Sequence, residues 1–413
     1  MTARRPLNIL YHHRTQGRGV ERVHVMSVVE AWRRRGHQVD VVSPPGVNPE
    51  RPETRGTGQR PTLLSWLAKR VPRMCFEFME VAYNVRGLGT LWLRHRRRRY
   101  DLVYERYAYL NLAGLITSRM AGVPFVFEVN FTSGTTLERE RSRAARVMER
   151  WVERYVFRRA DACVVVSSRL RVLLVDAGVD EAKVLIQPNA ADPAKFDPHR
   201  RADALRASLG LEGKLIVGFV GHFSRWHGVR FLCDAFEEIR QQVPDVAYLL
   251  VGDGHTRAEI ATMVRSRGWQ DCVLLPGKIP HDSVPDYVAL FDVAVMPDSN
   301  EYGSPMKIPE YMAAAKPVVA PRLWPIEDLL DDGRTGVLFE PGDGHELAAA
   351  LVGLLSDAGR RKALGQAARR EVEEVLNWDS AAERILMLAE KAVGPGDWYP
   401  RVAPEAGAGE PRS

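Results

Sequence analysis

Short apolar runs alternate with longer amphipathic segments along almost the whole chain. Short apolar runs are typical of buried strands, and segments with a period of 3.6 residues are typical of helices packed on one face. Strands that alternate with helices build parallel sheets from βαβ units, so the pattern predicts an α/β fold with doubly wound parallel sheets. The expected strands are 8–12, 38–43, 101–105, 124–129, 161–167 and 183–187 in the first half, and 215–221, 246–252, 272–277, 292–297, 317–321 and 336–340 in the second.

The two groups of strands predict two Rossmann-like domains, since a chain of 413 residues exceeds the size of one hydrophobic core. We expect an N-terminal domain over residues 1–190 and a C-terminal domain over 191–377. Between them, the segment PNAADPAKFDPHRRADA lacks apolar periodicity and is typical of a linker. A last helix at about 378–393 is expected to pack back on the N-terminal domain, and 394–413 has the composition of a disordered tail.

Charge is distributed unevenly in this chain. The net charge is +6, and arginines cluster in the first half. Between residues 61 and 99 arginines are mixed with Leu, Trp, Phe and Met, a composition suited to an anionic membrane surface. The alternative is a solvated helix face packed on its own domain. No motif supports binding to nucleic acid.

The predicted location is cytoplasmic, peripheral on the inner face of the cell membrane. The N-terminus lacks the apolar region of a signal peptide, and no stretch of the chain is long and apolar enough to span a bilayer. The four cysteines are far apart and show no C-x-x-C spacing, which is typical of buried thiols in a reducing compartment.

The segment 298–321, DSNEYGSPMKIPEYMAAAKPVVAP, predicts a binding device for a nucleotide. A helix can open at Ser304 and Pro305, or at Ile308 and Pro309, because proline suits the first turn. Lys307 adds a positive charge there, and Glu310 lies three residues further on the same face. These groups suit a diphosphate and a sugar hydroxyl. The alternative is an ordinary helix that leads into a strand.

The loop after the first strand contains glycines but is no dinucleotide fingerprint. The G-x-G-x-x-G spacing would require glycine at Arg22, and no acidic residue ends the second strand. Gly19 could still let a phosphate or an acceptor approach the backbone closely. A plain turn from strand to helix is the alternative.

Four segments of the second half, in the same order, carry a resemblance to a known family. They are VGFVGHFSRWHGVRFLCDAF, LLVGDGHTRAEI, VLLPGKIPHDSVPDYVALFDVAVMPD and EYGSPMKIPEYMAAAKPVVAP. They resemble the nucleotide-binding half of the retaining glycosyltransferases of family 4, which have the GT-B fold of two Rossmann-like domains facing across a cleft. The first half, with ILYHHRTQGRGVERVHV and PFVFEVNFTSGTTLERE, resembles the subgroup that builds bacterial exopolysaccharides and other surface glycans.

The resemblance implies a diphosphate site after the first strand of the C-terminal domain. The family pattern G-R-x-x-x-x-K-G keeps its spacing at Gly221 and Gly228, but His222 and His227 occupy the Arg and Lys places. Arg225 and Lys307 are expected to supply the missing charge.

The resemblance also implies contacts to the remaining parts of the donor. In the family's E-x7-E pair Glu310 keeps the role of binding the ribose, but Tyr302 stands where the first glutamate is expected. The amides of Gly303 and Ser304, next to Pro305, could take over contacts to sugar or phosphate. Recognition of the base is expected at Gly277, Lys278 and Ile279, over a floor kept open by Gly252 and Gly254. For each of these glycines a plain turn is the alternative.

In the N-terminal domain many members of this family carry a histidine at the end of the fourth strand. Here Glu128 occupies that place, followed by Asn130, and a carboxylate there could orient or deprotonate the acceptor hydroxyl. It could equally be a buried acid paired with Arg106.

Together these features predict a retaining glycosyltransferase of the hexosyltransferase type. Its donor would be a nucleotide diphosphate sugar and its acceptor a lipid-linked or growing glycan. We expect no cofactor and no metal, since no acidic D-x-D loop is present and His12 and His13 are adjacent on a strand. A nucleotide-sugar epimerase of the same fold and a non-catalytic partner subunit are the alternatives.

Overall fold

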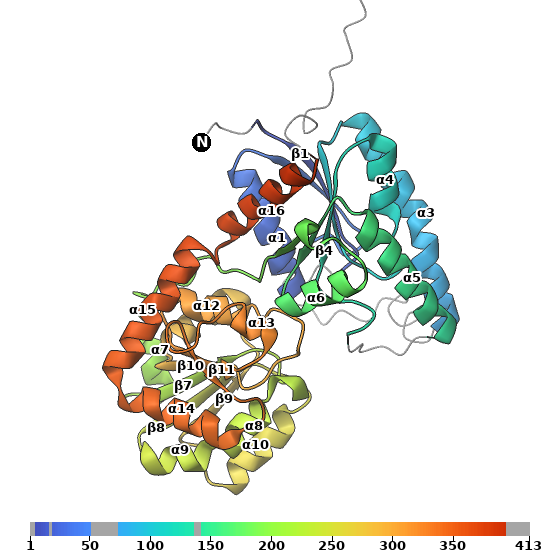
Figure 1. The fold of residues 1–413 in the computed structure, drawn as a ribbon. Helices are drawn as coiled ribbons and strands as arrows, with labels where there is room; N and C mark the ends of the chain where they lie inside the picture. Colours follow the sequence, from blue (N-terminus) through green and yellow to red (C-terminus); the bar gives the residue numbers. More distant parts are fainter. Residues whose placement is uncertain (1–4, 16–18, 51–72, 136–141, 394–413) are drawn as a thin grey trace, which may run out of the picture. The chain divides into compact units, whose positions relative to one another are not determined.

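The structure is a computed structural model that describes residues 5–15, 19–50, 73–135 and 142–393. Within these residues the strands form two six-stranded sheets, ordered β2-β1-β3-β4-β5-β6 and β12-β11-β10-β7-β8-β9. The chain divides into two compact units (Figure 1). The first unit comprises Met1–Val165, Arg171–Leu185 and Ala382–Ser413, and the second comprises Val166–Leu170 and Ile186–Ala381.

The strands lie at the positions expected from the apolar runs. Those of the first sheet are β1 (Asn8–His12), β2 (Gln38–Val42), β3 (Leu102–Arg106), β4 (Phe125–Val129), β5 (Ala162–Val165) and β6 (Val184–Ile186). Those of the second are β7 (Leu215–Val220), β8 (Val246–Val251), β9 (Val273–Gly277), β10 (Val293–Val295), β11 (Val318–Pro321) and β12 (Val337–Phe339). Neighbouring strands pair in parallel, so the predicted α/β class is confirmed.

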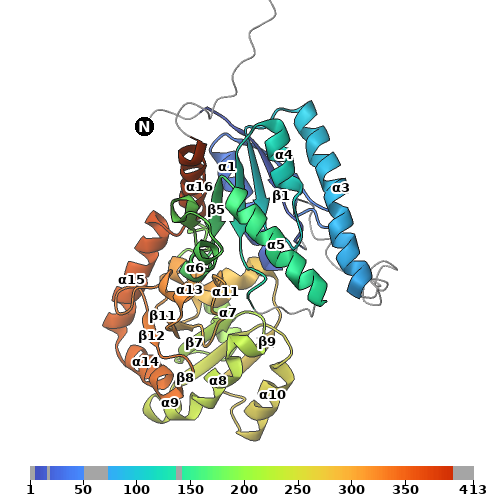
Figure 2. The same ribbon diagram turned by 45° about the vertical axis from the view of Figure 1, so that its right-hand side comes forward.

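Helices cover both faces of the first sheet. They are α1 (Gly19–Arg34), α3 (Arg73–Arg97), α4 (Ala113–Ala121), α5 (Arg143–Arg159), α6 (Ser168–Asp176) and the 3₁₀ turn η1 (Glu181–Lys183). Figures 1 and 2 show α1 on one face and α3, α4 and α5 on the other. Because both faces are covered, every residue of β3, β4 and β5 is buried, and this includes the charged residues Glu105, Arg106 and Glu128.

Helices also cover the second sheet, and together with its strands they form one continuous hydrophobic core. Its helices are α7 (Asp203–Ser208), α8 (Val229–Asp234), α9 (Phe236–Gln242), α10 (Arg257–Ser266), α11 (Val284–Ala289), α12 (Lys307–Ala313), α13 (Trp324–Glu327), α14 (Gly344–Ser356) and α15 (Ala358–Glu374), with the 3₁₀ turns η2 (Arg225–His227) and η3 (His281–Ser283). All residues of β8 and β10 are buried.

The last helix, α16 (Trp378–Val393), contacts the first helix of the chain near its own start. The indole nitrogen of Trp32 donates to the carbonyl oxygen of Ala382 at 3.0 Å, and Arg35 forms an ion pair with Glu383. Both contacts lie in the first unit, so α16 packs on α1 at Ala382 and Glu383.

Two expectations from the sequence concern segments that the structure does not describe. The apolar residues of 61–72 and the tail 394–413 lie outside the described residues. Among the helices that are described, none combines the length and the apolar character that a bilayer-spanning segment needs. Cys163 and Cys233 are buried, whereas Cys272 is half-buried.

Candidate functional site

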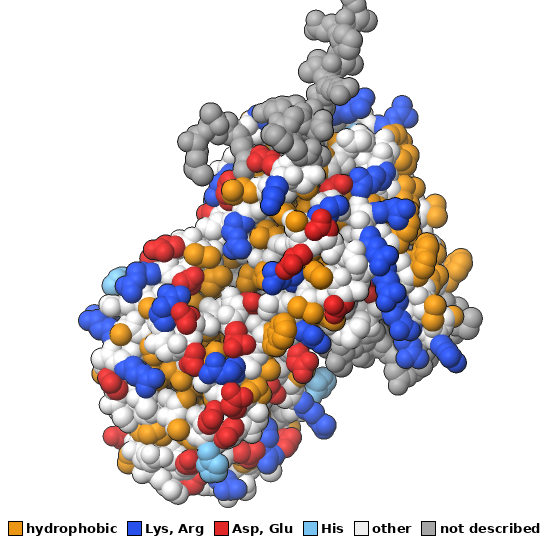
Figure 3. Space-filling model, viewed as in Figure 1, with side chains coloured by type: hydrophobic (Ala, Val, Ile, Leu, Met, Phe, Trp, Pro, Cys, Tyr) orange, Lys and Arg blue, Asp and Glu red, His pale blue; other side chains and the backbone are white. Residues whose placement is uncertain are grey.

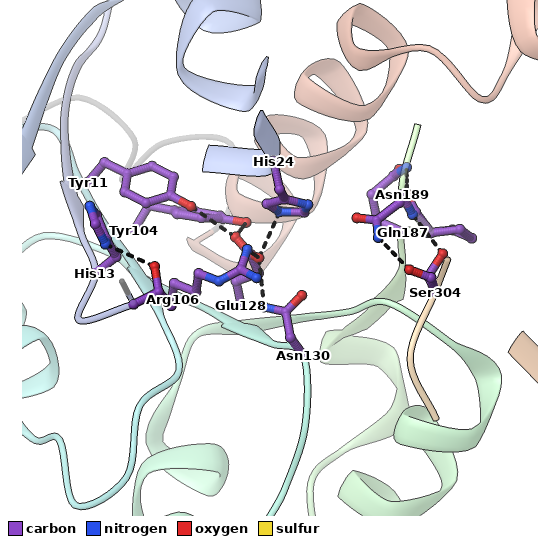
Figure 4. A network of polar contacts seen from close by, with 12 residues as sticks. Tyr11, His13, His24, Tyr104, Arg106, Glu128, Asn130, Gln187, Asn189 and Ser304 are labelled. Atoms are coloured by element: carbon purple, nitrogen blue, oxygen red, sulfur yellow. Dashed lines mark hydrogen bonds and ion pairs between the residues drawn. The ribbon is translucent and has the colours of Figure 1, made fainter. Parts of the chain in front are cut away.

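A buried carboxylate, Glu128 of β4, stands at the carboxyl-terminal edge of the first sheet (Figure 4). The side chain is 1% exposed. Five side chains surround its two oxygens: Arg106 at 2.7 Å, His24 at 2.8 Å and Asn130 at 2.8 Å on Oε1, and the hydroxyl groups of Tyr104 at 2.8 Å and Tyr11 at 3.2 Å on Oε2. The carboxylate is therefore the hub of a closed polar network.

This network fixes the protonation state of Glu128. Burial alone would raise the pKa of the carboxyl group, but the charges of His24 and Arg106 and the hydrogen bonds from His24 and Asn130 outweigh it and hold the pKa well below its usual range. Burial, with the charge of Glu128, keeps the pKa of Tyr11 and Tyr104 well above its usual range, so both hydroxyl groups stay donors. The ion pair with Arg106, which the sequence left open, is present. A carboxylate in this state takes up no proton near neutral pH.

The register of the parallel strands brings these charges together. Arg106 and Glu128 are register partners of β3 and β4, and His12 and Glu105 are register partners of β1 and β3. His12 and Glu105 are fully buried and bonded to each other. Their pairing was missed at the level of sequence because no pattern within one strand shows which strand will be its neighbour.

Glycines line the loops at the carboxyl-terminal ends of β7, β8 and β9. The N–H of Gly221 donates to Val251 O at 2.9 Å, and that of Gly252 donates to Gly277 O at 3.0 Å. A Cβ atom on Gly252 would lie 1.8 Å from Gly221 O, and one on Gly254 would lie 2.6 Å from Phe223 O. Close backbone packing therefore requires glycine at 252 and 254.

Lys307 lies beside Gly221, at the start of α12. A Cβ atom on Gly221 would lie 2.8 Å from Lys307 Nζ, and this nitrogen is 4.7 Å from the centre of the Phe219 ring. Burial lowers the pKa of Lys307 to about 7, against the effect of Glu310, which raises it. The helix begins at Lys307 itself, so Pro309 falls in its first turn, where a missing N–H is tolerated. An opening at Ser304 and Pro305 is not observed.

Glu310 follows on the same helix and is perturbed in the opposite sense. Burial raises its pKa to about 7, while the charges of Lys195 and Lys307 lower it. The side chains of Lys307 and Glu310 are half-buried. Two groups of opposite charge whose pKa values converge near neutrality are typical of a site that awaits a charged ligand.

The two histidines at the family's basic positions differ in environment. His227 is buried, and burial together with the charge of Lys307 lowers its pKa to about 3, so it is neutral. Its Nδ1 faces Ser224 Oγ at 3.2 Å and the carbonyl oxygen of His222. His222 and Arg225 are exposed. Positive charge at this loop therefore comes from Arg225 and Lys307, not from His227.

The loop before α12 is held by hydrogen bonds to other segments of the second unit. Ser167 Oγ donates to Tyr302 O at 2.6 Å. Asn189 Nδ2 donates to Ser304 O at 2.6 Å (Figure 4). The N–H of Gly303 donates to Asn300 Oδ1. That amide is thus engaged within the loop and is not available to a ligand as the sequence suggested. Asn300, which carries this turn, was missed.

The other predicted residues are placed as follows. Gly19 has φ of +57° and begins α1 in the first unit. Lys278 is exposed, whereas Ile279 packs against the core of the second unit. Pro305 is half-buried. No group of three or more His, Cys, Asp or Glu side chains suited to a metal occurs within the described ranges.

Comparisons with known proteins identify the class to which this fold and site belong. The family model "Glycosyl transferase 4-like domain" matches residues 19–190, and "Glycosyl transferases group 1" matches residues 214–357. Alpha-D-kanosaminyltransferase of Streptomyces kanamyceticus is 28% identical, with 83% of this chain and 92% of the relative covered. D-inositol 3-phosphate glycosyltransferase of Kineococcus radiotolerans is 30% identical, with 73% of each chain covered.

A solved structure agrees with these matches at the level of the fold. HepE of Anabaena in complex with UDP has a TM-score of 0.68 and 19% identity, with 92% of this chain and 99% of HepE covered. The chain therefore belongs to the GT-B glycosyltransferases of the group 1 and family 4-like type. Its reaction is glycosyl transfer.

Proposed function

We propose that the protein transfers a sugar from a nucleotide diphosphate sugar to a lipid-linked or growing glycan acceptor with retention of anomeric configuration. The product would be a surface polysaccharide or glycoconjugate, made in the cytoplasm on the inner face of the membrane. The observation that carries the proposal is the position of Lys307 beside Gly221, the residue after β7, with Glu310 three residues further along α12. Further support comes from HepE, which has been solved with UDP and with UDP-glucose.

The donor binds along the carboxyl-terminal ends of β7, β8 and β9. Lys307 and Arg225 bind the diphosphate, whose negative charge restores the proton on Lys307. Glu310 accepts hydrogen bonds from the ribose hydroxyls, a task that needs a carboxylate and no proton transfer. Gly277, Lys278 and Ile279 face the base. Retention rests on the family resemblance.

Departure of the diphosphate is the step at which these cations act. The bond between the anomeric carbon and the β-phosphate oxygen breaks, and a bond to the acceptor oxygen forms on the same face of the sugar. Lys307 and Arg225 stabilise the charge that develops on the leaving oxygen. Because Glu128 has a low pKa and both of its oxygens are engaged, the proton of the acceptor passes to the departing diphosphate. Glu128 and Asn130 orient the hydroxyl group of the acceptor.

The reaction needs no metal under this proposal, because side-chain cations neutralise the diphosphate. Transfer should persist at an unchanged rate in excess EDTA. A loss of activity that Mg²⁺ restores would contradict this part of the proposal.

A cyclitol is a second candidate acceptor. The relative from Kineococcus radiotolerans is named for D-inositol 3-phosphate, a small soluble acceptor. Offering labelled donor with a membrane lipid extract and, separately, with inositol phosphates distinguishes the two: label enters the organic phase for a lipid-linked acceptor and stays in the aqueous phase for a cyclitol.

The donor is identified first, by thermal-shift measurements with UDP-, GDP-, ADP- and TDP-sugars, since a bound donor stabilises the fold by mass action. Transfer is then compared in wild type and in the double variant Lys307→Ala/Arg225→Ala. We expect the double variant to lose at least about a thousandfold in rate, given that one electrostatic contact of this kind contributes roughly 10² to 10³. The control is Arg360→Ala/Lys362→Ala, which removes two charges from α15 outside the site.

The alternatives give different results in the same assay. An epimerase alters the sugar of the donor when no acceptor is present. A non-catalytic subunit shows the thermal shift without any turnover. Normal turnover by the double variant would refute the assigned roles of Lys307 and Arg225.

A further inference from the structure

Exposed apolar side chains gather on three helices of the first unit. Of the fifteen large apolar side chains that are exposed in the described residues, ten belong to α3, α4 and α5. They are Phe78, Met79, Val81, Val85 and Leu93 on α3, Ile116 and Met120 on α4, and Val147, Met148 and Trp151 on α5. Phe78 is 72% exposed, Val85 79% and Trp151 63%. We call this surface the α3–α5 face.

The outward side of α5 is strongly basic. Its two acidic residues, Glu149 and Glu153, are buried at 0% and 7% exposure. Its six arginines, by contrast, are all exposed: Arg143, Arg146, Arg150, Arg154, Arg158 and Arg159. The sequence therefore understates the positive charge, because the helix turns both of its carboxyl groups inward. In Figure 3 a column of basic side chains over α5 runs beside the apolar edge formed by α3.

Aromatic residues on α5 are arranged along the same outward side. Trp151 stacks on Tyr155 with ring centres 5.4 Å apart, and the guanidinium group of Arg159 lies 4.1 Å from the centre of the Tyr155 ring. Tryptophan and tyrosine are enriched where a membrane meets water, and arginine side chains extend their charge from such a region toward lipid head groups.

We infer that the α3–α5 face docks on an anionic lipid membrane. Apolar side chains among arginines suit a surface that offers acyl chains beneath negative head groups. A second copy of the chain would bring two strongly basic faces together, which like-charge repulsion opposes. The inference deepens the proposed function, on which it rests for the lipid-linked acceptor.

This surface overlaps with the one that the sequence suggested and extends beyond it. Within residues 61–99, Phe78 and Leu93 are exposed as expected, whereas Leu91 is buried and Trp92 stacks on His95. The most exposed aromatic side chain beyond α3 is Trp151 of α5, a helix outside that range. The fold thus combines α3 with α4 and α5, which lie outside that range, into one surface.

Sedimentation with vesicles tests the inference on the full chain. We expect the wild type to bind vesicles of phosphatidylcholine with one quarter phosphatidylglycerol, to bind pure phosphatidylcholine far more weakly, and to be released by high salt. The variant Arg146→Gln/Arg150→Gln/Arg154→Gln should bind on the order of a hundredfold more weakly, at about fivefold for each basic residue near an anionic surface. The variant Val147→Ser/Trp151→Ser should also bind more weakly, because less apolar surface enters the lipid.

The matched control is Arg360→Gln/Lys362→Gln/Arg370→Gln, which removes the same charge from exposed positions of α15. It should bind vesicles like the wild type. Equal binding by the α5 and α15 variants, or no binding of the wild type to anionic vesicles, overturns the inference. A concentration-dependent dimer that the Val147→Ser/Trp151→Ser variant abolishes, without vesicle binding, also overturns it in favour of a second copy.

Donor thermal shifts separate this inference from the proposed function. The α5 variants should keep the wild-type shift, because no residue of α5 is assigned to the donor. Vesicle binding without a donor shift contradicts the proposed function alone, whereas a donor shift without vesicle binding contradicts the docking surface alone.

Discussion

The two units hold buried charge in opposite ways. In the first unit Glu128 meets five partners, and its pKa lies well below the usual range. In the second unit Lys307 and Glu310 keep pKa values of about 7, one lowered and the other raised by burial. A centre whose hydrogen-bonding positions are all occupied, here called saturated, holds its protonation state and stabilises the fold. A desolvated centre without such partners, here called unsaturated, is stabilised when a ligand supplies the missing charge.

The backbone explains the difference. The partners of Glu128 come from parallel strands of the same sheet and from α1. Their side chains all point to the carboxylate of Glu128. Lys307 and Glu310 lie at the start of a helix opposite loops in which glycines replace side chains. At these glycines the loop backbones pack closely against one another and against Lys307, and burial there shifts the pKa values of Lys307 and Glu310 toward 7.

The same substitution in the two centres should have opposite consequences for stability. Glu128→Gln leaves Arg106 buried beside a neutral amide and should cost about 3–5 kcal/mol of unfolding free energy. Glu310→Gln should leave stability at pH 8 unchanged or raise it. Because the pKa of Glu310 is raised to about 7, ionising this group at pH 8 costs free energy in the folded state relative to the unfolded chain. Urea denaturation measures the unfolding free energy of both variants. Equal losses would show that Glu310 is paired as firmly as Glu128.

Close backbone packing should make Gly252 the most sensitive glycine of the second unit. With φ of +145° and a Cβ position 1.8 Å from Gly221 O, Gly252→Ala should cost about 2–4 kcal/mol. Gly268→Ala is the control, since Gly268 also has positive φ, +68°, but open space around its Cβ position. It should cost only about 1 kcal/mol, from backbone strain alone. Thermal unfolding of the pair separates the clash from the strain.

Donor affinity should pass through a maximum near pH 7. Below that pH Glu310 takes up a proton and no longer binds the ribose as a carboxylate, and above it Lys307 loses the proton that binds the diphosphate. Each limb should fall by about tenfold for each pH unit, or ~1.4 kcal/mol. Calorimetric titration with a nucleotide sugar, which does not itself titrate in this range, measures the profile.

Two variants show which residue causes each limb of the pH profile of donor affinity. Lys307→Arg should remove the alkaline limb, because guanidinium stays charged, and Glu310→Gln should remove the acidic limb at lower overall affinity. A profile that is flat between pH 5.5 and 9 would contradict the unsaturated state of this centre.

The smallest effect is expected in the loop before α12. Ser304 Oγ accepts from the N–H of Asn189 at 3.0 Å, so Ser304→Ala should cost about 1 kcal/mol of unfolding free energy. Ser208→Ala, which removes a solvent-exposed hydrogen bond to Leu205 O, should cost less and serves as the control. Indistinguishable denaturation midpoints for the two variants would mean that the serine does not hold this loop.

The strands could be predicted from sequence because burial on both faces leaves short runs that are largely apolar. Predicting the candidate site was more difficult. Lys307 and Glu310 were found because residues three apart on one helix share a face. Of the partners of Glu128, Arg106 was named from the sequence as an alternative. His24, Tyr11 and Tyr104 were not found, since they come from different elements. The buried position of Glu149 and Glu153 was likewise invisible, although it decides the charge of the α3–α5 face.

The sequence by itself determined the α/β class, the position of every strand, the glycosyltransferase resemblance and the segment that carries Lys307 and Glu310. Each of these depends on local periodicity or on residues close together in the chain. Only the tertiary structure decided that Glu128 is a saturated hub, that His227 is neutral, that the amide of Gly303 is engaged and that α3 and α5 share one surface. These features depend on which strands become neighbours and on how far each group is removed from water, and neither is encoded in any single segment.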